Sequence, residues 1–352
     1  MKILVIRFKN IGDVLLSSTI CRSLKASFPN SHIDYLVYTP GQDLFEQSND
    51  IDRVISLSSL ERRKPLRYLK RAWQISQNRY DIIIDATSTA KTELISMLSP
   101  SAQFRIGREK KGRGFFYTHK VPELETNKIE QRIALLTPLI DAGHSISLNK
   151  DISIPLSSKE RSQSFSKIVA AGVTLDRPIF ALNVSSKLNH RMWNFDYMYQ
   201  VAQYCIEEHN AQIILLQGMP HEQKNIYKFK QRFDQHSKAV FMVEAPGLRG
   251  MAALLSHCQL YVGNEGAPRH LAEAVGIPTV AIVSPTTCRE EWLRQGDSKH
   301  QAIEWKDIDA TASKSIGPHQ ADDPEYLQLY TLIKPNHVTP LIDDVVARHV
   351  AP

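Results

Sequence analysis

The sequence has 352 residues, about twice the length of a typical domain, and therefore predicts two domains. Hydrophobic residues make up 42% and charged residues 23%, which is usual for a soluble globular protein. The four cysteines form no C-x-x-C pair, which argues against a zinc or redox motif and favours reduced thiols in a cytoplasmic protein; no apolar run approaches the roughly 20 residues of a membrane span.

The net charge of +6 is carried by the first half of the chain. Residues 1–155 hold 23 lysines and arginines against 16 carboxylates, and the remaining residues hold 20 against 21. The excess is concentrated in ERRKPLRYLKRAW (61–73) and RIGREKKGRGFFYTHK (105–120). Each stretch is either a solvated face or a surface for an anionic ligand or membrane, and Phe115, Phe116 and Tyr117 favour the membrane for the second. No nucleic-acid recognition motif is present.

The first half alternates strand and helix patterns. Apolar runs predict strands at 2–8, 32–38, 53–57 and 80–86, and a four-residue apolar spacing predicts a helix after the first strand. A basic helix is predicted at 65–78 and another at 127–144. This alternation predicts a parallel sheet covered on both faces. Residues 144–160 are polar and contain a proline, so we interpret them as the link between domains.

The second half repeats the alternation. Strands are predicted at 178–184, 211–217, 239–244, 259–263 and 278–284, and helices at 195–208, 220–235, 248–257 and 268–275. Residues 306–325 predict a surface loop, and 336–350 a last amphipathic helix. Two doubly wound domains place a ligand-binding cleft at the carboxyl ends of their sheets.

Asp13 follows the first strand directly, in the turn Gly12–Asp13. An acid there can cap the helix and complement its dipole, or it can act as a base at the carboxyl edge of the sheet. The turn lacks G-x-G-x-x-G, so dinucleotide binding is poorly supported. The residues alone leave both readings open.

Three turns of the second half offer groups to a phosphate or a sugar. NVSSKLNHRMW (183–193) is polar and basic, and LLQGMPHEQ (215–223) places Glu222 in the first turn of a helix. YVGNEGAPRH (261–270) is a glycine-rich strand-to-helix turn, which allows close backbone approach to a phosphate. Each of the three could instead be an ordinary solvated turn.

Two D-x-D pairs are present, Asp50/Asp52 and Asp307/Asp309. This spacing can hold a divalent metal with a nucleotide sugar. Neither pair follows an apolar strand in the nucleotide-like half, so we assign both to surface loops and expect no metal site.

Taken in order, ILVIRFKNIGDVLLS, YDIIIDA, RMW, GMPHE and HLAEAVGIPTVAIVSPT resemble glycosyltransferase family 9, the lipopolysaccharide heptosyltransferases, over nearly the whole chain. The resemblance implies an α/β GT-B fold: two Rossmann-like, doubly wound parallel-sheet domains facing a central cleft. It implies an acceptor-binding domain at 1–155, a nucleotide-sugar-binding domain at 156–336, and a helix at 337–352 that could pack back on the first domain.

The resemblance also assigns roles to residues. It implies that Asp13 is the catalytic base, that Arg191 contacts the donor diphosphate, that Glu222 binds the ribose and that His270 ends the donor turn. The remaining expected donor-binding residues are Ser185, Ser186, Lys187, Gly263, Asn264, Glu265 and Gly266, and the expected acceptor-binding residues are Arg62, Arg63, Lys64, Arg108, Lys110, Lys111 and Arg113.

The expected reaction is inverting, metal-independent transfer of heptose from ADP-heptose to the inner core of lipopolysaccharide or lipooligosaccharide, without a cofactor. The expected site of action is the cytoplasmic face of the inner membrane, with peripheral membrane contact and an anionic lipid A-core acceptor. The turn departs from the family's usual D-[ST]-G, because this chain has Glu265, Gly266 and Ala267. The alternatives are therefore another nucleotide sugar, for capsule or O-chain, and a family member that binds sugar nucleotide or glycan without turnover.

Overall fold

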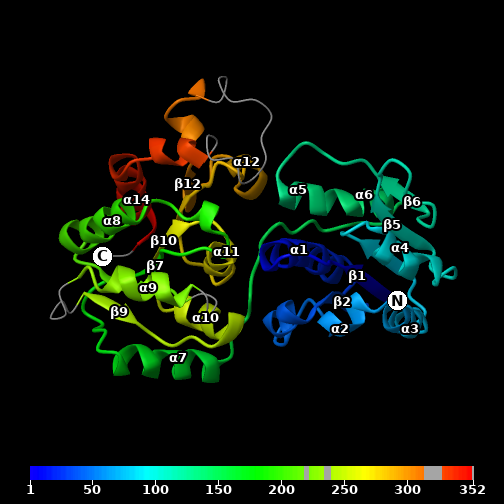
Figure 1. The fold of residues 1–352 in the computed structure, drawn as a ribbon. Coiled ribbons are helices and arrows are strands. Elements are labelled where there is room, and N and C mark those ends of the chain that lie inside the picture. Colours follow the sequence, from blue (N-terminus) through cyan, green and yellow to red (C-terminus); the bar gives the residue numbers. More distant parts are fainter. Residues whose placement is uncertain (218–221, 234–238, 313–326, 351–352) are drawn as a thin grey trace. The chain divides into compact units, whose positions relative to one another are not determined.

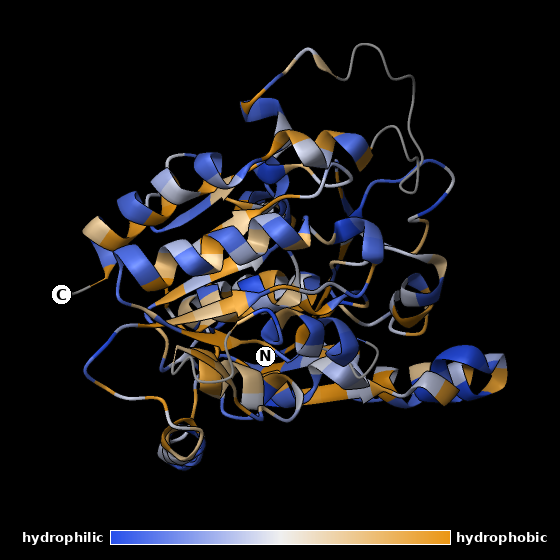
Figure 2. Ribbon diagram, turned by 60° about the vertical axis from the view of Figure 1, so that its left-hand side comes forward, coloured by the Kyte–Doolittle hydropathy of each residue, from blue (hydrophilic) through white to orange (hydrophobic). Residues whose placement is uncertain are grey.

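The computed structural model describes residues 1–217, 222–233, 239–312 and 327–350. The chain divides into two compact units, Met1–Pro155 and Leu156–Pro352. Each unit is built on a six-stranded parallel sheet with helices on both faces, and Figure 1 follows them from blue to red. In Figure 2 the strands are mainly hydrophobic, whereas the helices alternate between hydrophobic and hydrophilic turns. No helix in the described ranges has the length and apolar character needed to cross a bilayer.

The first sheet has the strand order β3-β2-β1-β4-β5-β6. Its strands are β1 (Lys2–Ile6), β2 (His32–Tyr38), β3 (Arg53–Leu57), β4 (Ile82–Asp85), β5 (Phe104–Arg108) and β6 (His119–Val121). Its helices are α1 (Ile11–Ser27), α2 (Ser59–Arg63), α3 (Pro65–Ser76), α4 (Ala90–Met97), α5 (Lys128–Ile133) and α6 (Thr137–Asp141). The four predicted strands are confirmed, but α4, β5 and β6 were not predicted.

Two helix layers cover this sheet. Leu4 and Ile6 of β1 pack in one cluster with Tyr68, Ala72 and Ile75 of α3. On the opposite face the Tyr35 hydroxyl donates to the Val14 carbonyl of α1 (2.7 Å). The helix predicted over 127–144 is instead divided into α5, a 3₁₀ turn at Ala134–Leu136, and α6. Pro138 lies in the first turn of α6, where its missing N–H is tolerated, but it prevents one continuous helix.

The second sheet has the order β12-β11-β10-β7-β8-β9. Its strands are β7 (Ile179–Asn183), β8 (Gln212–Leu215), β9 (Val240–Met242), β10 (Leu260–Asn264), β11 (Thr279–Ile282) and β12 (His300–Ile303). Its helices include α7 (Ser158–Ala170), α8 (Phe195–Glu208), α9 (Gln223–Lys230), α10 (Gly247–Leu255), α11 (Ala267–Ala274), α12 (Arg289–Trp292) and α14 (Pro335–His349). Strand β12 was not predicted, and the predicted loop 306–325 lies largely outside the described residues.

The C-terminal helix α14 belongs to the second unit. Val338, Ile342 and Val345 are fully buried in the same core cluster as the strands β7, β10 and β11. Its apolar stripe is therefore used in the second core, and a contact of this helix with the first domain stays a prediction.

Candidate active site

Asp13 lies in the first turn of α1, at the carboxyl edge of the first sheet, and is 7% exposed. The position before the helix is taken by Asn10, whose side chain makes no capping bond. Asp13 Oδ1 accepts hydrogen bonds from the guanidinium groups of Arg7 and Arg132, the second at 3.1 Å. Within the described part of the chain, no hydrogen bond reaches Oδ2. The carboxylate is thus fixed by cations and keeps one oxygen for another partner, which a helix cap would not require.

Two arginines contact Asp13, and a third buried arginine, Arg108, lies near both of them. Arg7 follows β1 and donates to the Ala86 carbonyl, Arg132 of α5 donates from Nε to Ser17 Oγ (3.1 Å), and Arg108 ends β5 and donates to the Gln131 carbonyl. Arg7 Nε and Arg108 Nη1 are buried and have no hydrogen-bond partner in the described structure.

The electrostatic consequence is an excess of buried positive charge. Burial, reinforced by Arg7 and Arg108, lowers the pKa of Arg132 to about 9. Lys9 is an exposed cation nearby: partial desolvation and the neighbouring Arg7 lower its pKa, and the Asp13 carboxylate opposes that shift. Desolvated cations of this kind favour a bound anion, because attraction to the anion compensates for the solvation free energy lost on burial.

The predicted acceptor-binding residues form two separate groups, and the first lies on α2. Arg62, Arg63 and Lys64 are exposed where α2 follows β3 at the same sheet edge. The Arg62 guanidinium lies 4.6 Å from the centre of the Tyr38 ring, which stacks on Phe8. This places α2 beside the strand that leads to Asp13.

The second basic cluster is corrected by the structure. Lys111 and Arg113 are exposed and Lys110 is half-buried, but Arg108 is buried and is not a surface charge. Tyr117 is buried too, and its hydroxyl donates to Asp85 Oδ2 (2.6 Å), so it cannot serve as an interfacial aromatic residue. A side chain at Gly107 would lie 2.2 Å from the Tyr117 ring, which explains the glycine in β5.

In the second unit, Arg191 and Glu265 meet at the carboxyl edge of the sheet. Arg191 Nη1 lies 3.3 Å from Glu265 Oε1, and Thr287 Oγ1 donates to the same oxygen (2.8 Å). Burial raises the pKa of Glu265. Thr287 was not predicted, because it lies beyond the next strand and carries no motif of its own.

The other predicted donor-binding residues differ in accessibility. Ser185 is buried, Ser186 is half-buried and Lys187 is exposed in the loop after β7. Glu222 is buried directly before α9. The preceding Gly218 and Pro220 of GMPHE lie outside the described residues.

The glycine-rich turn has an internal explanation. Gly263 has φ 140°, and a Cβ there would lie 2.4 Å from the Asn183 carbonyl oxygen of the paired strand. Asn264 is fully buried and its Oδ1 accepts from the Trp193 backbone N–H (2.8 Å). These two residues therefore support the packing of β10 against β7 and the loop that follows it, and their contact with the donor stays a prediction. Gly266, with φ 142°, precedes α11, and a Cβ there would be in ordinary contact with Pro268 Cδ, at 3.8 Å.

His270 also faces the protein. It is 5% exposed, Arg269 Nη2 lies 2.8 Å from its Nδ1, and its ring centre lies 5.3 Å from that of Trp292. Burial lowers the pKa of His270 well below its usual value, which favours the neutral ring. The side chain is thus packed within the second unit, and its contact with the donor stays a prediction.

The D-x-D carboxylates have protein partners. Asp50 pairs with Arg22 (2.9 Å), Asp52 with Lys25 (2.9 Å) and Asp307 with Arg289 (2.6 Å), and Asp309 accepts from Thr311.

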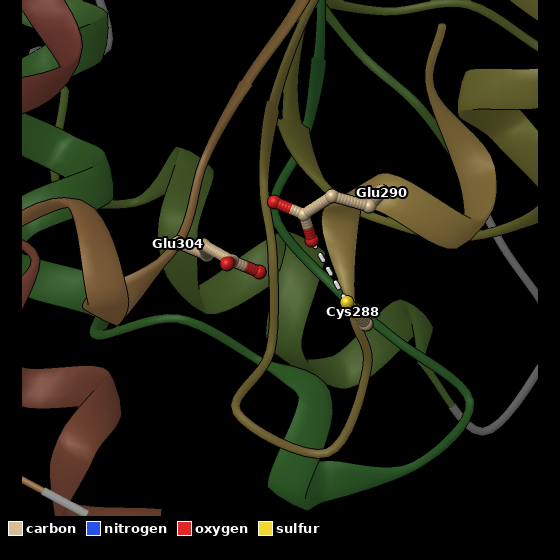
Figure 3. A group of neighbouring side chains, drawn as sticks. All are labelled: Cys288, Glu290 and Glu304. Carbon is tan, nitrogen blue, oxygen red and sulfur yellow. Dashed lines mark hydrogen bonds between the residues drawn. The ribbon is translucent and has the colours of Figure 1, made fainter. Parts of the chain in front are cut away.

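A different group, Cys288, Glu290 and Glu304, has ligand-type atoms within 4.8 Å of one another (Figure 3). The Cys288 thiol donates to Glu290 Oε2 (2.8 Å), and Glu304 Oε2 accepts from the Arg289 backbone N–H (3.1 Å). Burial raises the pKa of both Cys288 and Glu304, which favours the protonated thiol. The group reads as a hydrogen-bonded anchor of α12 on β12.

Comparisons of the sequence and of the structure with known proteins point to the same family. The sequence model of glycosyltransferase family 9 (heptosyltransferase) matches residues 68–305. Lipopolysaccharide heptosyltransferase 3 of Escherichia coli is 22% identical over 283 residues, covering 78% of this chain and 81% of that protein.

Two solved structures share the fold over nearly their full length. The glycosyl transferase family 9 protein from Veillonella parvula has a TM-score of 0.79 at 18% identity, covering 98% of this chain and 97% of that one. The E. coli ADP-heptose lps heptosyltransferase II has a TM-score of 0.75 at 17% identity, covering 100% of both chains. The predicted GT-B fold is confirmed.

Proposed function

Because the chain belongs to glycosyltransferase family 9, we propose that this glycosyltransferase moves a heptose from ADP-heptose to the inner core of lipopolysaccharide or lipooligosaccharide, with inversion and without a metal. The names of two similar proteins support this choice of donor and acceptor. One is a lipopolysaccharide heptosyltransferase, and the other is an ADP-heptose lps heptosyltransferase. The observation that carries the proposal is Asp13, held through one oxygen by two arginines at the edge of the first sheet.

Asp13 acts as the general base. Its Oδ2 takes the proton of the acceptor hydroxyl while that oxygen attacks the anomeric carbon of the donor. The bond from the anomeric carbon to the nucleotide diphosphate breaks as the new glycosidic bond forms on the opposite side. Arg7 and Arg132 position the carboxylate, because both donate to Oδ1 and neither occupies Oδ2.

The leaving diphosphate is stabilised by the second unit. Arg191 is the leading cation, and the half-buried Ser186 and exposed Lys187 in the same loop add donors. Arg191 pairs with Glu265 in the structure, so the diphosphate would replace a carboxylate as its partner. Glu265 then remains beside the sugar, and its extra methylene relative to aspartate makes it the residue that decides which donor fits.

The acceptor is an anion held at the edge of the first unit. Arg108, Arg132 and Lys9 provide positive charge beside the base, and Arg62 to Lys64 extend it along α2. Phosphate and carboxylate groups suit such donors because charge-assisted hydrogen bonds to them are short and strong. A lipid-linked acceptor also implies that the enzyme works at the cytoplasmic face of the inner membrane, in peripheral contact with it.

The test is release of nucleotide diphosphate by purified protein, with ADP-heptose and a panel of truncated lipopolysaccharides. We expect ADP release that depends on both donor and acceptor, and a product with the inverted anomeric configuration. If the protein turns over only another nucleotide sugar, the donor in this proposal is wrong. Glu265, which stands where the family usually has aspartate, is the reason to test this alternative. Donor binding without any release of diphosphate would identify a non-catalytic family member.

A further inference from the structure

Helix α3 exposes an apolar stripe on its outer face. Leu66 is 82% exposed, Leu69 46% and Trp73 55%, and their spacing of three and four residues puts them on one side of the helix. Leu60 of the neighbouring α2 is 46% exposed as well. Single exposed apolar residues are common on protein surfaces, but four gathered on adjoining helices indicate a binding surface.

The fold does not need this stripe. The inner face of α3 is made by Tyr68, Ala72 and Ile75, which are buried against the sheet, and the Tyr68 hydroxyl donates to the Lys91 carbonyl. The outer face therefore keeps large apolar side chains in water although the helix is already anchored by the other side.

Positive charge borders the stripe. Residues 59–76 contain six cations and one carboxylate, Glu61, which already caps α2 and lies 3.6 Å from Arg71. The cations are Arg62, Arg63, Lys64, Arg67, Lys70 and Arg71. An exposed tryptophan and leucines flanked by lysine and arginine are the composition of helices that lie in the headgroup region of anionic membranes.

We propose that the α2–α3 surface, formed by Leu60, Leu66, Leu69 and Trp73 with its surrounding cations, docks on an anionic lipid bilayer. The helix lies along the interface, with the leucines and Trp73 among the upper acyl chains and Arg67 and Lys70 at the lipid phosphates. A protein partner fits less well, because it would need carboxylates placed opposite Arg67 and Lys70, whereas an anionic bilayer offers phosphates along the whole helix.

The position of this surface gives it a purpose that rests on the proposed function. Arg62 stacks on Tyr38, whose ring lies on Phe8 near the start of α1. A docked α3 would hold the membrane beside the sheet edge that carries Asp13, where a lipid-linked acceptor has to arrive. The surface would thus replace a three-dimensional search for the acceptor by a search along the membrane.

The test compares vesicle binding of matched variants by co-flotation. The stripe variant is Leu66→Ser/Leu69→Ser/Trp73→Ser, and the charge variant is Arg67→Gln/Lys70→Gln. The control, Phe165→Ser/Val169→Ser/Leu175→Ser, removes three apolar side chains that are 38–64% exposed in the second unit. Vesicles contain either phosphatidylcholine alone or phosphatidylcholine with phosphatidylglycerol.

We expect the wild type and the control to bind vesicles containing phosphatidylglycerol. The stripe variant should bind at least about tenfold more weakly, and the charge variant about fivefold more weakly for each charge removed. Trp73 is 55% exposed, whereas Trp193 and Trp305 are buried and Trp292 is half-buried, and the variant Trp73→Phe separates its emission from theirs. Its emission should shift to shorter wavelength with these vesicles, and the shift should be absent in Trp73→Phe.

Three results would overturn the proposal. These are equal binding to phosphatidylcholine alone, loss of binding in the control to the same extent, and a wild-type dimer that the stripe variant dissociates while neither binds vesicles. The last would identify an interface between two copies of the chain. ADP release with a de-acylated, water-soluble acceptor separates the two proposals. We expect the stripe variant to keep this activity, and absence of release in the wild type would refute the function without affecting the vesicle result.

Discussion

The carboxyl edges of the two sheets carry charge in opposite ways. In the first unit, Arg7 and Arg132 donate to the single carboxylate of Asp13, and Arg108 adds a third buried cation nearby. In the described structure, Arg7 Nε and Arg108 Nη1 are buried without a partner. In the second unit, Arg191 is matched by the carboxylate of Glu265, although its buried Nε has no partner among the described residues, and Asn264 is satisfied by the neighbouring strand and loop.

The difference indicates what each edge is prepared to bind. An edge with more buried cations than carboxylates is incomplete until an anion arrives, whereas an edge whose cation already faces a carboxylate exchanges one partner for another. The motifs of the two units therefore have different meanings. Asp13 keeps one carboxylate oxygen for a reacting partner, whereas Gly263 and Asn264 make contacts between strands of their own sheet.

Replacing the acid of the first edge should have the largest effect. We expect Asp13→Asn to lower kcat by roughly 10²–10⁴-fold, since the amide cannot accept the acceptor proton. Donor affinity should change little, because Asp13 does not hold the nucleotide. Steady-state ADP release and donor binding by calorimetry measure the two quantities. A variant with normal kcat would return Asp13 to the helix-dipole interpretation and remove the contrast between the edges.

Removing one cation of the first edge should have the next largest effect. Arg132→Gln deletes the bonds to Asp13 and Ser17, and we expect kcat/KM for the acceptor to fall about 10- to 100-fold while the donor KM stays constant. Arg132→Lys should recover part of the loss, since it restores the charge.

The matched control is Arg53→Gln at the amino edge of the same sheet, where Arg53 pairs with the buried Asp34. It should lower stability and leave both KM values near wild type. If Arg53→Gln and Arg132→Gln give the same kinetic profile, the effect of Arg132 is only structural.

These residues show how far the sequence alone can reach. Buried parallel strands are continuous apolar runs, so both sheets and the acid after β1 could be predicted. Arg132 could not, because 119 residues separate it from Asp13 and only the fold brings them together. Arg7 did carry a signal, since a charge inside the apolar run KILVIRF needs a buried partner.

The same limit explains the errors. Strand β5, FRIGR, was overlooked because its two arginines suggested a surface, although Arg108 is buried. The glycine at 263 was attributed to a phosphate, but the group that excludes a side chain is the Asn183 backbone on a neighbouring strand. A local pattern reveals that space is short at a position; it does not reveal what fills it.

A paired charge of the second unit should affect stability and not catalysis. Glu160 caps α7 and pairs with Arg249 of α10, and these bonds lower the pKa of Glu160 to about 2. The lowered pKa means that its contribution is complete above about pH 4.5 and is lost as the pH falls towards 2. We expect Glu160→Gln, which can keep the capping bonds, to lower the free energy of unfolding by about 1–2 kcal/mol at pH 7.

Urea denaturation at pH 7 and pH 3 measures this effect, and the difference from wild type should shrink at the lower pH. The control is Glu244→Gln, because Glu244 is 81% exposed and lies 3.8 Å from Lys167. It should be nearly neutral, since exposed ion pairs contribute little. Reduced ADP release in Glu160→Gln at full folding would show that this charge also serves the site.

Chelation should have the smallest effect. The D-x-D carboxylates are engaged by Arg22, Lys25, Arg289 and Thr311, and Arg191 with the turn before α11 can supply the positive field that a cation would otherwise give. We therefore expect ADP release to stay within about twofold of its untreated value in excess EDTA. Loss of activity that Mg²⁺ or Mn²⁺ restores would contradict this, and Cys288→Ser would then locate the ion. If the metal requirement disappears or weakens in that variant, the cluster with Glu290 and Glu304 holds the ion; if it is unchanged, the ion is held elsewhere.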